Sequence, residues 1–152
     1  MRPTETLKHE HQVVLLVLKG TEREGKLAKK GGEFNTGNVE KMVDFFKMFV
    51  DRCHHAKEER HLFPALEKHG VPREGGPIGV MLSEHDEGRA HVRAIAASLP
   101  DLKSGRREVA AEIGDRLLSY ATLLRAHIDK EDKRCFARWP TASCPPRRVW
   151  PS

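Results

Sequence analysis

The chain has 152 residues, of which 32% are charged and 38% hydrophobic, and its formal net charge is +5. This length favours one domain with a continuous core. No run approaches the roughly 18 apolar residues that a membrane span needs, and no apolar stretch follows a basic segment at the start. We therefore expect no membrane span, no signal peptide and a cytoplasmic location.

The positive charge is concentrated near the C-terminus. Arg138, Arg147 and Arg148 lie in a segment without acidic residues, whereas acidic and basic residues are interspersed along the rest of the chain. Interspersed charges are typical of solvated helix faces. The charge pattern therefore does not indicate a nucleic-acid-binding protein. The three cysteines are odd in number and lack CxxC spacing, so they predict neither a disulfide framework nor a cysteine metal site.

The apolar residues recur with helical spacing in four segments, and no segment alternates like a strand. Taken in chain order, we expect helices over residues 4–30, 39–68, 77–99 and 102–137. Thr4 and Asn38 are the predicted N-caps of the first two, and Pro100 is expected to follow the end of the third. Short links between long helices predict an all-α fold, an antiparallel up-down four-helix bundle over residues 1–137. Residues 138–152 are predicted to be an irregular, basic, proline-rich tail.

Nine histidines are the unusual feature of the composition. At 100° per residue, His11, His85 and His127 each lie at the centre of the apolar face of their own helix. Glu131 follows His127 by four residues and lies about 40° from it on the same face. These four polar side chains are therefore predicted to point into the core.

The second helix offers two pairs with four-residue spacing, His54/Glu58 and His55/Glu59. On an α-helical wheel the apolar residues centre about 80–90° from His55 but about 170° from His54. Glu59 is also nearer to that centre than Glu58. The predicted inward pair is therefore His55/Glu59, and Glu58 is expected to be a solvated charge.

The predicted inward-facing set comes from all four helices and comprises His11, His55, Glu59, His85, His127 and Glu131. Two carboxylates are unfavourable in a small core unless a positive charge neutralises them. Imidazole and carboxylate ligands together suit iron, manganese or zinc. Six ligands exceed the four of a tetrahedral zinc site, so the pattern favours a site for two metal ions.

The order of these residues resembles the hemerythrin/HHE cation-binding family. The matching segments are EHQ at 10–12, HHAKEERHLFPAL at 54–66, SEHDEGR at 83–89 and HIDKED at 127–132. The resemblance implies an antiparallel four-helix bundle with an oxo- or hydroxo-bridged di-iron centre as its cofactor. By position it implies four imidazole ligands, from His11, His55, His85 and His127, and two bridging carboxylates, from Glu59 and Glu131.

The chain departs from the oxygen-carrying members of that family. Arg89 stands where they have a second histidine on the third helix, and their helix-four carboxylate corresponds to Asp132 rather than Glu131. These differences argue against simple oxygen carriage. Whether Glu58, Asp132 or Tyr120 joins the ligands is left open.

The resemblance implies a protein that binds or senses O2, NO or iron at the metal centre. The alternatives are a di-iron redox enzyme acting on peroxide or nitric oxide, and a scaffold whose metal is structural. The expected partner is a small diatomic molecule or oxidant, with no nucleic acid and no membrane.

Overall fold

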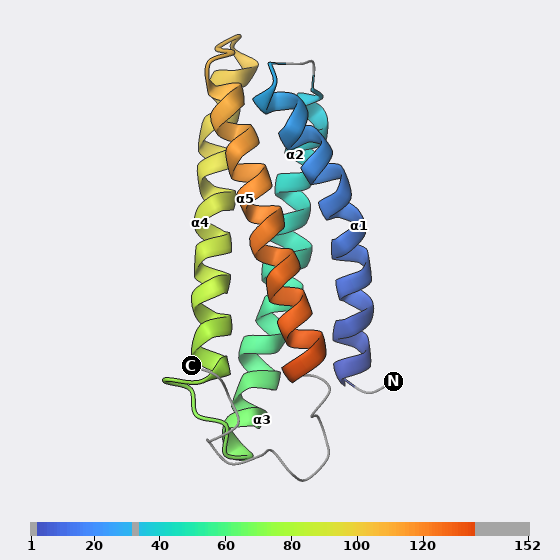
Figure 1. Ribbon diagram of the computed structural model, residues 1–152, viewed down its shortest axis with the longest axis vertical. Coiled ribbons are helices and arrows are strands. Elements are labelled where there is room, and N and C mark those ends of the chain that lie inside the picture. Colours follow the sequence, from blue (N-terminus) through green and yellow to red (C-terminus); the bar gives the residue numbers. More distant parts are fainter. Residues whose placement is uncertain (1–2, 32–33, 136–152) are drawn as a thin grey trace.

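A computed structural model describes residues 3–31 and 34–135, and these residues form four antiparallel helical rods (Figure 1). The first rod is α1 (Pro3–Lys29) and the third is α4 (Pro77–Lys103). The fourth is α5 (Val109–Lys130), which continues as η3 (Glu131–Cys135). The second joins four segments, α2 (Thr36–Phe45), η1 (Phe46–His55), η2 (Glu58–Leu62) and α3 (Phe63–Lys68). The all-α up-down bundle predicted from the sequence is confirmed.

Several predicted helix ends need correction. Asn35, not Asn38, caps the second rod, because its side chain accepts a hydrogen bond from the Asn38 backbone N–H at 3.1 Å. The third rod runs through Pro100 to Lys103, and the Ser104 N–H bonds the Pro100 carbonyl at 3.0 Å. A proline removes only one N–H from the ladder, so a helix can pass it in its last turn. The predicted tail, residues 138–152, lies outside the described residues.

The second rod is α-helical at both ends and mostly π-helical in its middle. Phe46–His55 and Glu58–Leu62 form backbone hydrogen bonds from residue i to i+5, so that each turn takes in one residue more than an α-turn. Residues of this rod therefore advance around the axis by less than 100° each. π-Helical turns are rare and occur often at functional sites.

The core consists of two apolar clusters separated by a polar layer. The larger cluster contains Val14, Val50, Val92 and Leu124, and the smaller contains Leu7, Leu62, Phe63 and Met81. His11 follows Leu7 and precedes Val14 on α1, and His85 lies between Met81 and Val92 on α4. The histidines thus lie in a layer between two regions that exclude water. Within the described residues, no helix is both long and apolar enough to cross a membrane.

Candidate metal centre

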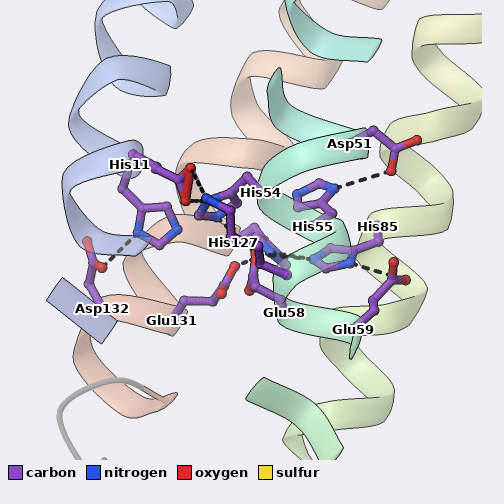
Figure 2. Close-up of polar contacts among 12 residues, drawn as sticks. His11, Asp51, His54, His55, Glu58, Glu59, His85, His127, Glu131 and Asp132 are labelled. Carbon is purple, nitrogen blue, oxygen red and sulfur yellow. Dashed lines mark hydrogen bonds and ion pairs between the residues drawn. The ribbon is translucent and has the colours of Figure 1, made fainter. Parts of the chain in front are cut away.

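Five histidines meet in the polar layer, and each rod contributes at least one. All five are at most 4% exposed, and Figure 2 shows their rings directed toward one another. The rings of His55 and His85 stack at 3.7 Å between centroids, and those of His11 and His54 lie 4.7 Å apart. Two carboxylates, Glu58 and Glu131, lie among these rings and are 0% exposed.

The seven side chains form two groups of potential metal ligands that share one carboxylate. In each group, one nitrogen or oxygen atom from every residue lies within 4.8 Å of the others. The first group is His55, Glu58, His85 and His127, and the second is His11, His54, Glu58 and Glu131. Glu58 belongs to both groups, so it could contact two ions at once. Glu131 also contacts His127 Nε2, so it too lies between the groups.

The structure brings five of the six predicted residues together but leaves Glu59 outside. The side chain of Glu59 is 27% exposed and accepts a hydrogen bond from Arg89 Nη2 at 2.8 Å. Its other oxygen lies 3.6 Å from Nδ1 of His85, on the side of that ring facing away from the groups. The prediction that Glu59 faces the core is therefore wrong, and Glu58 occupies that place.

The α-helical wheel missed Glu58 and His54 because the second rod is π-helical. The smaller angular step of the π-helical turns adds up along the rod, so His54 and Glu58 lie elsewhere around its axis than 100° steps predict. The sequence did carry a signal for this geometry. Buried residues recur every four positions from Phe46 to Leu66, through Val50, His54, Glu58 and Leu62. A period of four sustained over five steps drifts around an α-helix of 3.6 residues per turn, but stays near one face of a rod in which α-turns alternate with wider π-turns.

Each of the five histidines also has, near its Nδ1 nitrogen, a carboxylate that belongs to neither group. We call these five side chains the outer carboxylates. Three of these contacts are within hydrogen-bonding distance, namely His11 to Asp132 at 2.8 Å, His54 to Glu10 at 3.3 Å and His127 to Glu84 at 3.3 Å. A carboxylate can only accept, so Nδ1 donates the proton and Nε2 keeps the free electron pair. His85 and His55 have looser neighbours, Glu59 at 3.6 Å and Asp51 at 3.9 Å. Asp132 is thus placed outside the groups, as a partner of His11.

Cations hold four of these outer carboxylates in place. Lys57 donates to Glu10 at 2.7 Å, and Lys130 donates to both oxygens of Glu84 at 2.7 Å. Arg89 donates to Asp51 at 2.7 Å and to Glu59 at 2.8 Å. Such chains of partners orient metal-binding imidazoles and raise their basicity. Arg89 stands where the oxygen carriers have a histidine, and here it orients two outer carboxylates, Asp51 and Glu59.

The two buried carboxylates, Glu58 and Glu131, lie close together, and their pKa values are shifted in opposite directions. Burial and the neighbouring Glu131 raise the pKa of Glu58 well above its usual value. Burial also acts to raise the pKa of Glu131, but its contacts with Glu58 and His127 outweigh that effect and lower it well below the usual value. The opposite shifts have one cause, because two carboxylates this close cannot both ionise cheaply, so the neutral form is favoured on Glu58 and the charged form on Glu131.

The histidine pKa values are shifted in opposite directions. Burial and the neighbouring His127 lower the pKa of His85 to about 3, and burial lowers that of His55 as well. Burial also disfavours charge on His127, but Glu131 and Glu84 outweigh it and raise its pKa to about 10. These shifts favour the charged form of His127 beside the charged form of Glu131.

This donor set fits metal ions better than it fits a metal-free core. The oxygens of Glu58 and Glu131 are fully buried, and each carboxylate contacts a histidine nitrogen, His54 Nε2 at 2.9 Å for Glu58 and His127 Nε2 for Glu131. Buried carboxylates usually have several hydrogen-bond donors or a cation beside them. Imidazole and carboxylate ligands are the combination that iron, manganese and zinc accept.

Fold and site together define a helical-bundle protein with a buried histidine–carboxylate centre of the cation-binding type. A family model, the hemerythrin HHE cation binding domain, matches residues 2–139, nearly the whole chain. The chain belongs to this family. No curated protein and no solved structure gives a significant match.

The outer carboxylates give a first prediction. We expect Glu84→Gln to lower metal affinity about 10- to 100-fold, because His127 loses the negatively charged partner of its Nδ1 nitrogen. Isothermal titration of metal into metal-free protein measures the effect. Glu87→Gln, an exposed residue of the same helix, is the matched control and should bind like the original chain. Equal affinity in the two variants would contradict the role given to Glu84.

Proposed function

We propose that this protein binds two iron ions between its helices and takes up a small exogenous ligand there, such as O2 or NO. One ion would be held by His55, His85 and His127, and the other by His11 and His54. Glu58 and Glu131 would lie between them. The observation that carries the proposal is the pair of buried four-residue groups that share Glu58.

The asymmetry of the two groups supports uptake of a ligand rather than a purely structural metal. One offers three imidazoles, and the other offers two. With two shared carboxylates, neither ion reaches six protein ligands, so both would keep room for an exogenous molecule. Iron at such a centre supplies reversible ligand binding and electron transfer.

The chain's own residues control the surroundings of that centre. The two apolar clusters keep bulk water away, and Phe63, whose ring lies 5.8 Å from that of His85, closes the layer on one side. The outer carboxylates hold protons at the Nδ1 atoms, which fixes the Nε2 atoms of His11, His54 and His127 as metal ligands. This arrangement favours a centre with constant geometry.

The test is the metal content of aerobically purified protein together with its visible absorption before and after azide. About two irons per chain, as the two groups require, and absorption bands that shift with azide would support the proposal. One zinc per chain, or a flat spectrum even after anaerobic iron loading, would overturn it. Catalytic consumption of peroxide or nitric oxide by the iron-loaded protein would instead favour a di-iron redox enzyme.

A second prediction concerns pH. Metal must displace the proton of His127, whose pKa is raised to about 10 by neighbouring carboxylates, and that of Glu58, whose pKa is also raised. Apparent affinity should therefore rise with pH, by about tenfold per unit for each proton displaced. Titrations between pH 6 and 8, in buffers of different ionisation enthalpy, measure both the affinity and the protons released. An affinity that is constant or falls over this range would contradict these pKa shifts.

A further inference from the structure

A pocket of about 280 Å³ lies between η1 and α4 and reaches the histidine layer. The apolar part of its wall comes from Phe46, Val50, Val92 and Tyr120, all of which are buried. The ring of Tyr120 packs against that of Phe46 at 4.4 Å between centroids. The apolar side of the pocket is therefore part of the packed core.

His55 connects the pocket to the metal-type groups. It lines the pocket and is also one of the four residues of the first group. Its Nδ1 is buried without a hydrogen-bond partner and faces Asp51, a second lining residue, at 3.9 Å. Buried ring nitrogens almost always have a partner. A polar molecule in this pocket would be within reach of that nitrogen.

The rim of the pocket is basic. Lys47, Arg52 and Arg93 line it and are exposed, and none of them forms an ion pair within the described parts of the chain. Arg89 also lines it, but Asp51 and Glu59 neutralise that guanidinium. Clefts lined by one sign of charge raise the local concentration of oppositely charged ligands and their association rates.

One glycine keeps the pocket open. A Cβ at Gly88 would lie 3.4 Å from Tyr120 Cε2, so a longer side chain would extend into the space that Gly88 and Tyr120 line. Gly88 is a mid-helix residue of α4, where glycine is less favourable than alanine.

We propose that this pocket is the route by which a small inorganic anion reaches the metal centre, arriving beside His55 and drawn in by Lys47, Arg52 and Arg93. The inference rests on the proposed metal centre. It adds small monovalent anions to the ligands of that centre, and it places their arrival at the three-histidine group.

The experiment measures association of two probes with iron-loaded protein by stopped-flow absorption. Azide is the anionic probe and nitric oxide the neutral one. We expect Gly88→Leu to slow both probes at least about tenfold, because the pocket is filled. Arg93→Gln should slow azide about threefold at low ionic strength but leave nitric oxide unchanged, and added salt should remove the difference.

Two matched controls separate the route from general damage. Gly20→Leu places the same side chain on α1, where a Cβ also has its nearest neighbour at 3.4 Å, the flexible end of Met42. Arg107→Gln removes an exposed charge between α4 and α5. Both should leave the two rates unchanged, and iron content should be equal in all variants.

The outcomes distinguish this proposal from the function on which it rests. Protein that binds no iron overturns both. Iron-loaded protein that binds neither probe also overturns both, because the proposed function includes uptake of a ligand. Iron-loaded protein that binds both probes, but in which Gly88→Leu slows neither, overturns the pocket proposal alone. If Gly88→Leu slows both probes but Arg93→Gln does not slow azide, the preference for anions is overturned.

Discussion

Glu58→Gln will lower iron affinity by at least about 100-fold, more than removal of an outer partner costs. Glu58 is the one residue that belongs to both groups, so the change removes a ligand from each ion. The fold itself should tolerate the change. Since the pKa of Glu58 is raised well above its usual value, the metal-free side chain is already neutral, and glutamine has nearly the same shape. Isothermal titration measures affinity, and circular dichroism of the metal-free variant measures folding.

Glu59→Gln is the matched control because it is the same substitution at the next residue. Glu59 contacts Nδ1 of His85 at 3.6 Å and pairs with Arg89, so its loss should cost about tenfold at most. Metal affinity that falls further in Glu59→Gln than in Glu58→Gln would show that the bundle interior differs from this structure. That result would instead favour Glu59 as the inward-facing carboxylate, as an α-helical wheel predicts.

Three of the four rods could be predicted from the sequence because they are α-helical around the site. In α1, α4 and α5 the 100° step holds, and His11, His85 and His127 are buried as their apolar neighbours indicate. Glu131 is buried as well, although η3 begins there, because only one turn separates it from His127. Over a single turn, the difference between the α-helical and π-helical angular steps is too small to move a side chain to the other face of the helix.

The sequence prediction for the inward face of the second rod is wrong because it assumes α-helical turns throughout, although a four-residue period of buried side chains runs through the rod. Neither glycine nor proline occurs between Val39 and Phe63, so no residue marks the π-helical turns. In this geometry both histidines of the His54–His55 pair are buried, one in each metal-type group. His55 thereby gives the first group a third imidazole, in a chain that has Arg89 where oxygen carriers have a histidine on α4.

The contacts of the outer carboxylates with the histidines could not be predicted from the sequence either. Glu10, Glu84 and Asp132 look like ordinary surface charges of amphipathic helices, and each contacts a histidine of a different rod. Contacts between residues 43 to 121 positions apart depend on how the helices rotate and slide against one another. Periodicity within one helix carries no information about that rotation.

Metal removal is expected to lower stability without unfolding the bundle. Binding to the folded state alone stabilises a protein by about 4 kcal/mol when free metal exceeds Kd about 1,000-fold. For a chain of this size that corresponds to a shift of about 8–16 °C in Tm. The two apolar clusters lie outside the polar layer and do not depend on metal, so helical content should persist in the metal-free protein. Thermal unfolding followed by circular dichroism, with iron and with a chelator, measures both quantities.

Glu58→Gln supplies the control for this measurement, because its Tm should hardly respond to iron. Its metal-free form should unfold at or slightly above the temperature of the metal-free original chain, since a neutral amide replaces an acid that Glu131 already keeps protonated. Equal Tm values for the original chain with and without iron would argue against tight binding. Complete loss of helical content on chelation would instead indicate a structural metal, because a centre that exchanges ligands needs a bundle that stays folded around it.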